Sequence, residues 1–266
     1  MIISSIFWNV SPEIMKLGPF SLRWYGLLFA SGFVLGYLIL TKIYKLEKKP
    51  LADLEQLSIY VILGTVIGAR LGHCLFYDPV YYLSHPIEII KVWEGGLASH
   101  GAAIGILISI YLITKKQKDK TMLWILDRLV IVVALGGALI RLGNLFNSEI
   151  IGRPADVPWA FIFARVDDTP RHPAQLYESF FYLITFVVLY FTYMKTNKKS
   201  LPGYLFGLAL VMIFGFRFFV EFIKENQSPF EQGMILDMGQ LLSIPFVIAG
   251  FYFMFRKRNE VIHKKT

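Results

Sequence analysis

Seven long apolar runs alternate with short polar stretches along the chain. Each run is close to the roughly 20 residues that an α-helix needs to cross the hydrocarbon core of a bilayer. The pattern therefore predicts an all-α membrane protein with about seven transmembrane helices. The predicted spans are residues 20–40, 56–76, 95–114, 122–142, 176–194, 202–222 and 235–255.

Groups of basic residues follow the first, third, fifth and seventh runs. With seven spans, all four groups lie on one side of the membrane. The positive-inside rule assigns that side to the cytoplasm. We therefore expect the N-terminus outside and the C-terminus in the cytoplasm. The groups are Lys42, Lys45, Lys48 and Lys49; Lys115, Lys116, Lys118 and Lys120; Lys195, Lys198 and Lys199; and Arg256, Lys257, Arg258, Lys264 and Lys265.

The composition agrees with a membrane protein, because 55% of the 266 residues are hydrophobic and only 17% are charged. This is too apolar for an ordinary soluble surface. We expect residues 1–266 to form a single polytopic membrane domain. The longest polar connection, at about 144–175, is expected to form a small extracytoplasmic cap, and chemistry is expected on that face.

Two further classes of function are disfavoured by the sequence. The net charge of +8 would suit nucleic acid, but the basic residues stand in short stretches between apolar runs, which favours lipid, so no nucleic-acid partner is expected. Cys74 is the single cysteine, which excludes an internal disulfide and a multi-cysteine metal site. No other side chains have metal-ligand spacing, so no metal is expected.

Three arginines fall within or at the outer ends of the second, fourth and sixth predicted spans. They are Arg70, Arg141 and Arg217. Arginine is costly in hydrocarbon and usually faces a cavity or a partner. The planar guanidinium suits phosphate, and phospholipid head groups supply it, so the three could share one pocket near the outer leaflet. The alternative is that each pairs with a local carboxylate, such as Glu221 one turn after Arg217, or reaches the interface.

Two other stretches carry candidate chemistry. His100, at the outer start of the third span among small residues, could accept a proton from a thiol or hydroxyl, or could be a packed histidine bonded to a neighbouring carbonyl. The densest polar stretch is RLGNLFNSEIIGRP at 141–154. Exposure in a loop explains part of this polarity. It does not explain why Arg141 and Asn144 already appear where the apolar run is ending. Its polar members are Arg141, Asn144, Asn147, Glu149 and Arg153.

This stretch, together with RWYG at 23–26, GGLASHG at 95–101, HPAQLYES at 172–179 and FGFRFFVEF at 214–222, resembles the prolipoprotein diacylglyceryl transferase family. The family signature runs Gly-Arg-x-Gly-Asn-Phe-x-Asn-x-Glu-x-x-Gly. Here Ile140 to Gly152 read I-R-L-G-N-L-F-N-S-E-I-I-G. Ile140 replaces the expected Gly and Leu145 the expected Phe, which changes packing positions and keeps every polar position.

The resemblance implies the first step of bacterial lipoprotein maturation, without a cofactor or metal. The diacylglyceryl group of phosphatidylglycerol would move to the lipobox cysteine thiol in the signal peptide of a prolipoprotein, and glycerol phosphate would leave. The expected partners are these two substrates and the surrounding membrane lipids. The expected location is the bacterial cytoplasmic membrane, as a multi-pass protein.

The resemblance also implies roles for individual residues. Arg141 and Arg217 would hold the phosphate and stabilise the leaving group, and His100 would accept the thiol proton. An arginine-rich site could also lower the pKa of the thiol without a histidine base. We expect the following to bind or orient substrate, Arg70 being added from its place in the second span: Tyr25, Arg70, Asn144, Asn147, Glu149, Gly152 and Glu221.

A transporter of an anionic solute is the main alternative, since it could use the same intramembrane arginines along a substrate path. It predicts spans broken near the middle of the membrane and openings on both sides. The polar residues instead gather toward the outer face, which favours the transferase.

Overall fold

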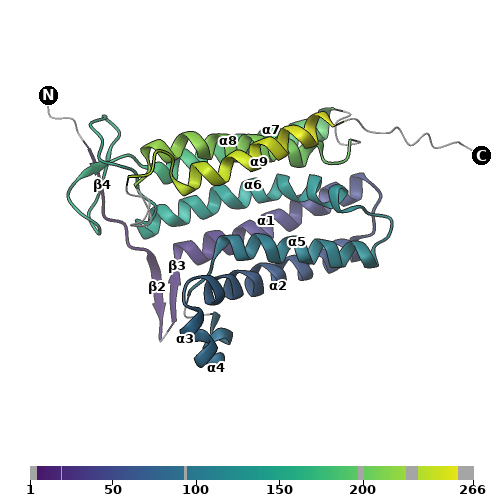
Figure 1. Ribbon diagram of the computed structural model, residues 1–266, viewed down its shortest axis with the longest axis horizontal. Helices are drawn as coiled ribbons and strands as arrows, with labels where there is room; N and C mark the ends of the chain where they lie inside the picture. The colour runs from purple at the N-terminus through teal and green to yellow at the C-terminus, as the bar shows by residue number, and fades with distance from the viewer. Residues whose placement is uncertain (1–4, 19, 93–94, 197–200, 226–232, 257–266) are drawn as a thin grey trace, which may run out of the picture. The chain divides into compact units, whose positions relative to one another are not determined.

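The computed structural model describes residues 5–18, 20–92, 95–196, 201–225 and 233–256. Within these ranges, six helices are long and apolar enough to cross a membrane, which confirms an all-α, multi-pass membrane protein. The chain contains them in the order shown in Figure 1. They are α1 (Trp24–Leu46), α2 (Leu51–Phe76), α6 (Met122–Asn147), α7 (Ala174–Lys195), α8 (Tyr204–Val220), which continues into the 3-10 turn η3 (Glu221–Ile223), and α9 (Met238–Phe255).

A further helix, α5 (Ser99–Lys116), occupies the place of the third predicted span. Lys115 and Lys116 in its last turn make it less apolar than the other six. The count of seven spans and the orientation of the chain therefore stay predictions. Part of the basic residues used for that orientation, including Lys198, Lys199 and those after Arg256, lie outside the described residues.

The chain divides into two compact units, and each is described by itself. Unit 1 contains Met1–Gly36 and Leu126–Thr266, and unit 2 contains Tyr37–Ile125. The boundaries fall inside α1 and α6. The single membrane domain expected from the sequence stays a prediction.

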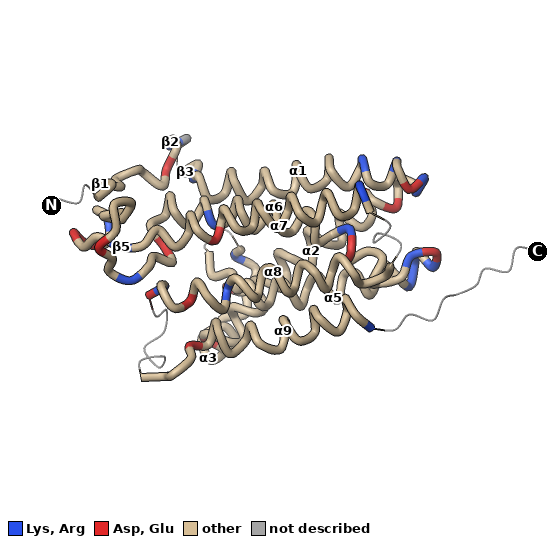
Figure 2. The backbone as a smooth tube through the Cα atoms, turned by 90° about the horizontal axis from the view of Figure 1, so that it is seen from above, with Lys and Arg blue, Asp and Glu red and all other residues tan. Residues whose placement is uncertain are grey.

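Unit 2 is built on direct contact between the backbones of α2 and α5. A Cβ atom added to Gly68 would lie 3.0 Å from the Cα of Gly105 and would collide with the carbonyl oxygen of Gly101. Small residues at four-residue spacing therefore let the helices approach closely. Charged residues of this unit stand toward the helix ends, and the middle of α5 has none (Figure 2). The glycines of α2 are Gly64, Gly68 and Gly72, and they face Gly101, Gly105 and Ser109 of α5.

The helices of unit 1 pack through glycines and aromatic rings. Gly207 of α8 and Gly250 of α9 are in contact, because a Cβ on Gly207 would lie 2.6 Å from the carbonyl oxygen of Gly250. The carboxylate of Asp127, buried in α6, accepts hydrogen bonds from the backbone N–H groups of Gly203 and Phe206, at 2.7 and 2.8 Å. Asp127 therefore caps the start of α8, which satisfies donors that a helix leaves unpaired at its N-terminus.

The predicted cap region contains short strands that the sequence analysis did not predict. β4 (Phe161–Phe163) pairs in parallel with β1 (Ile6–Trp8) and antiparallel with β5 (Pro170–Arg171). A separate hairpin joins β2 (Glu13–Leu17) and β3 (Phe20–Arg23). Strands of two to five residues are too short to show an alternating pattern. A small apolar cluster forms at the three-stranded sheet β1-β4-β5. It contains Phe161 and Phe163 of β4 together with Leu145 and Ile151, and Trp8 and Leu176 pack against it.

Arg171 ties the cap together from a nearly buried position. Its Nη2 lies 2.5 Å from Oδ2 of Asp167 and its Nε donates to Oδ1 at 3.2 Å. Its Nη1 lies 3.2 Å from a carboxylate oxygen of Glu225, just beyond η3. The hydrogen bonds from Arg171 hold the pKa of Asp167 below its ordinary value.

Acid is expected to loosen the cap through Asp167. Because the folded-state pKa of Asp167 is lowered, its ion pair stabilises the cap fully above about pH 4, and this contribution is lost as the pH falls further. Asp167→Asn should therefore raise hydrogen exchange in 155–173 at pH 7, and the difference from the wild type should shrink below about pH 4. Asp156→Asn, an exposed aspartate of the same segment, is the control and should change little. A difference independent of pH would contradict this role.

Candidate functional site

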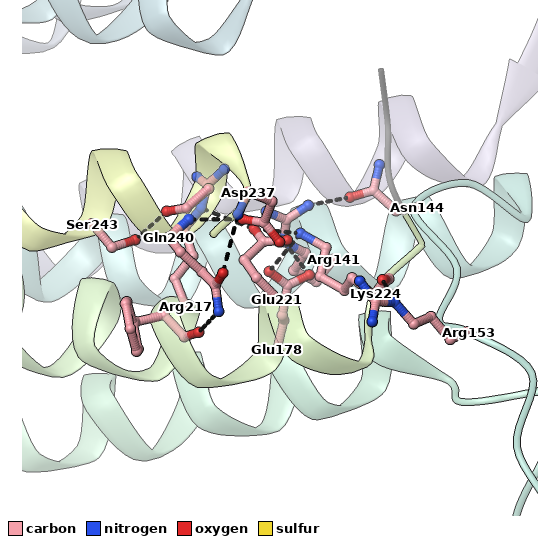
Figure 3. A network of polar contacts seen from close by, with 12 residues as sticks. Arg141, Asn144, Arg153, Glu178, Arg217, Glu221, Lys224, Asp237, Gln240 and Ser243 are labelled. Atoms are coloured by element: carbon pink, nitrogen blue, oxygen red, sulfur yellow. Dashed lines mark hydrogen bonds and ion pairs between the residues drawn. The ribbon is translucent and has the colours of Figure 1, made fainter. Parts of the chain in front are cut away.

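The ends of four helices of unit 1 meet where α6 and α8 finish and where α7 and α9 begin. Arg141 lies two turns before the end of α6, and Glu178 lies in the second turn of α7. Arg141 Nε is 3.1 Å from Glu178 Oε2, and its Nη1 donates to Oδ1 of Asn144 at 3.2 Å (Figure 3). Glu178 is only 2% exposed, so its charge depends on nearby cations.

The end of α8 adds a second charged pair and a buried lysine. Arg217 Nε donates to Oε1 of Glu221 at 3.2 Å, one turn further along the chain. Lys224 Nζ donates to the same oxygen at 2.8 Å and lies 3.8 Å from Oε1 of Glu178. The side chain of Lys224 is 2% exposed. Contacts therefore link Arg141, Glu178, Lys224, Glu221 and Arg217 in one chain of alternating charge (Figure 3).

The start of α9 closes the cluster next to Glu221. A Cβ on Gly239 would collide with the Glu221 carboxylate, so any larger residue there would have to displace that carboxylate. Asp237 and Gln240 form a capping box at this helix start, and Gln240 also donates to the carbonyl of Phe218 at 3.2 Å. A helix N-terminus favours a nearby negative charge, so α9 stabilises the carboxylate.

The turn after α6 gathers the other polar residues of the signature. The carboxylate of Glu149 accepts hydrogen bonds from Asn144 at 3.3 Å and from Asn147 at 3.1 Å. The buried amide of Gln175 donates to the carbonyl of Glu149 at 2.6 Å. Ile150 has a φ of +56°, a backbone conformation that is costly for a β-branched residue and often marks a functional turn.

Gly152 and Tyr25 owe their places to close packing. Gly152 donates to the carbonyl of His172 at 3.0 Å and forms a bridge with Lys224. A Cβ there would lie 2.5 Å from the His172 oxygen and 2.9 Å from that of Ile223. Tyr25 lies against Gly143, where a Cβ would come within 2.8 Å of its ring, and it interacts electrostatically with Glu149 and Arg141.

A small pocket opens beside the charged cluster, between α7 and α8. Its walls are aromatic and aliphatic, and its charged members are a glutamate and an arginine of the cluster. Its accessible volume is about 0 Å³, so it is a packing gap beside the cluster and not a ligand cavity. The pocket is lined by Glu178, Phe181, Tyr182, Ile213, Phe216 and Arg217.

Two of the predicted site residues belong to unit 2. Arg70 is buried and donates to the backbone carbonyls of Glu88 at 2.5 Å, Ile89 at 3.0 Å and Gly95 at 2.6 Å. It therefore fastens the segment that contains α3 (Pro79–Ser84) and α4 (Pro86–Ile90).

His100 is the second residue of α5 and is exposed in this unit. Its ring packs at 5.2 Å from Phe76 and stacks at 6.0 Å on Tyr77. Binding by Arg70 and proton transfer by His100 stay predictions.

The structure thus brings Arg141, Asn144, Arg217 and Glu221 together with residues that the site prediction did not include. Glu178 had a signal, because it makes the entrance of the fifth span more polar than a span requires. Lys224 had none, since it follows a span end where lysines are common. No group of three or more His, Cys, Asp or Glu that could hold a metal ion occurs within the described residues.

Several apolar helices whose ends enclose a largely buried cluster of three cations and two carboxylates define a multi-pass membrane protein with a charged site at its helix ends. Residues 12–256 match the model of the family described as prolipoprotein diacylglyceryl transferase, and the chain belongs to that family.

Three relatives are each named phosphatidylglycerol-prolipoprotein diacylglyceryl transferase. The one from Chloroherpeton thalassium is 51% identical over 99% of this chain and 98% of its own. Those from Tolumonas auensis and Bacteroides fragilis are 48% and 49% identical, over 96% of this chain and 98% and 96% of theirs.

Proposed function

We propose that this chain transfers the diacylglyceryl group of phosphatidylglycerol to a cysteine thiol of prolipoproteins, the first step of lipoprotein maturation. The similarity along nearly the whole length to relatives named for this transfer carries the proposal. The net positive cluster at the helix ends gives it a physical basis. The same family membership disfavours an anion transporter.

The reaction needs one bond made and one broken. The thiol sulfur attacks the glyceryl C3 carbon of the lipid, a thioether forms, and the bond between that carbon and the phosphate oxygen breaks. Glycerol phosphate leaves with the electron pair, and the thiol proton passes to a base. Negative charge grows on the leaving phosphate, so the enzyme must stabilise an anion.

We assign that task to Arg141 and Arg217. Each has a carboxylate partner that orients its guanidinium, and the Arg217 side chain remains 36% exposed. Planar guanidinium groups can donate two hydrogen bonds to one phosphate. Asn144, Asn147 and Glu149 then orient Arg141 and the head group, and Gly152 keeps the turn close to the cluster.

We assign the thiol proton to His100, whose exposed ring at the start of α5 is open to a substrate. The other route is a thiol acidified by the arginines alone, and replacement of His100 separates the two. Arg70 and Tyr25 are proposed as residues that shape the lipid-binding region. The acceptor is proposed to be the lipobox cysteine of a signal peptide. The enzyme is proposed to lie in the bacterial cytoplasmic membrane, in contact with its lipids.

The test uses purified protein in phosphatidylglycerol micelles with a synthetic lipobox peptide. We expect the peptide to gain the mass of one diacylglyceryl group and an equal amount of glycerol phosphate to appear. The matched control is the same peptide with serine in place of its cysteine, which should gain nothing. If the intact cysteine peptide gains no mass in micelles that contain phosphatidylglycerol, the transferase proposal is wrong.

A further inference from the structure

Lys224 is the cation of the cluster that lies within 4 Å of both buried carboxylates. Its Nζ is 2.8 Å from Glu221 Oε1 and 3.8 Å from Glu178 Oε1. Each carboxylate in turn contacts an arginine, at 3.1 Å for Arg141 and 3.2 Å for Arg217. Lys224 therefore lies in the middle of the series of alternating charges, between the pair Arg141–Glu178 and the pair Arg217–Glu221, which come from different helices (Figure 3).

Among the five side chains of this chain of contacts the charges do not cancel, because Lys224 is a third cation beside two carboxylates. Arg141 with Glu178 and Arg217 with Glu221 would form two neutral pairs. Lys224 adds a positive charge and shares both carboxylates, so neither arginine is fully neutralised. An anionic group that approaches the two guanidiniums then meets the net positive charge of these five side chains, of which Glu178, Glu221 and Lys224 are buried.

The backbone at Lys224 is held independently of its side chain. Its carbonyl accepts a hydrogen bond from Nε of Arg153 at 2.9 Å, and its N–H donates to the carbonyl of Glu221 at 3.2 Å. The next N–H, of Glu225, donates to the carbonyl of Ile151 at 3.2 Å. Substitution of the side chain should therefore leave this segment in place against the cap.

Resting on the proposed transferase function, we propose that Lys224 is a positioning residue for the phosphate of the lipid substrate. Its ammonium bridges the Glu178 and Glu221 carboxylates and neutralises part of the negative charge that would otherwise be balanced by the arginines alone. Arg141 and Arg217 thereby keep the orientation and the positive charge that an anionic head group needs. Lys224 itself acts through these side chains.

The test compares charge variants of the purified, full-length protein in the transfer assay. Lys224→Met removes the central charge and should lower kcat/KM for phosphatidylglycerol on the order of 100-fold, like the loss of one anion-stabilising donor. Lys224→Arg keeps the charge and should stay within about tenfold of wild type, by the same scale. Thermal unfolding in detergent reports whether each variant is folded.

A double variant separates charge from structure. Glu178→Gln with Lys224→Met restores the net charge of the cluster, so it should be more active than Lys224→Met by about tenfold or more, a coupling expected of contacting charges. If Lys224 only packs the cluster, the double variant will be no better than the single one. That result overturns the proposal.

The remaining outcomes also decide between the claims. Wild-type protein without transfer means that the proposed function fails, whereas active wild type with an equally active Lys224→Met means that only this inference fails. If Lys224→Met does not fold, Lys224→Arg decides. A folded Lys224→Arg without activity would show that charge at this position is not what matters.

Discussion

Replacing Arg141 by alanine is expected to lower the rate of diacylglyceryl transfer by about 10²- to 10³-fold, the usual cost of removing one group that stabilises a developing anion. The change removes a guanidinium that lies 3.1 Å from Glu178 and hydrogen-bonds Asn144. It also leaves the 2%-exposed Glu178 with Lys224, at 3.8 Å, in place of an arginine at 3.1 Å, and a buried carboxylate with a weaker partner destabilises the site. Release of glycerol phosphate, followed over time, measures the effect.

Arginine-to-lysine changes make this prediction specific. Arg141→Lys keeps the charge but loses the planar fork, so it should recover little activity. Arg128 is the matched control, because it is a buried arginine of the same helix, roughly 20 Å away along the helix axis. Arg128→Lys should transfer at nearly the wild-type rate. Equal activity of Arg141→Ala and wild type would remove Arg141 from the catalytic site.

Gly105→Leu is expected to disrupt unit 2. A Cβ at this position would collide with the carbonyl oxygen of Gly64 and lie 2.9 Å from its carbonyl carbon. Backbone atoms cannot move aside as a flexible side chain can, so α2 and α5 would have to separate. Overpacking costs about 1–3 kcal/mol and more where backbone must shift, which corresponds to a midpoint of unfolding lower by roughly 10 °C.

The control for this change is Gly215→Leu in α8, where a Cβ would meet no atom within 4 Å. Both variants place the same side chain in the middle of an apolar helix, so they differ in contacts and not in helix propensity. The midpoint temperature of thermal unfolding in detergent should fall much more for Gly105→Leu than for Gly215→Leu. If both variants unfold at the same midpoint temperature, the glycine contact between α2 and α5 is not what stabilises unit 2.

The helices could be predicted from the sequence because the bilayer imposes a length of apolar residues that few other structures need. The charged site could be predicted in part for the same reason. Arg141 and Arg217 stand inside apolar runs, where an arginine needs an explanation. Glu221 follows at helical spacing, and the structure pairs it with Arg217 as that spacing suggests.

Lys224 could not be found in this way, because its burial depends on how the segment after η3 folds against the cap. Its carbonyl contact with Arg153 joins residues that are far apart in the sequence. The strands β1, β4 and β5 were missed for a related reason. Each takes its hydrogen-bond partners from distant parts of the chain, and none is long enough to carry a local pattern.

The pairing of β1 with β4 has a consequence for the order of synthesis. Ile6 aligns with Phe161, so the first strand leaves the ribosome about 150 residues before its partner exists. At about 5–20 residues per second, it waits roughly 8 to 30 s. Trp8 likewise waits for the carbonyl of Leu145 at the end of α6. The cap is therefore a late step of assembly, completed only after α6 has been made, and a bulky fusion at the N-terminus would burden that step most.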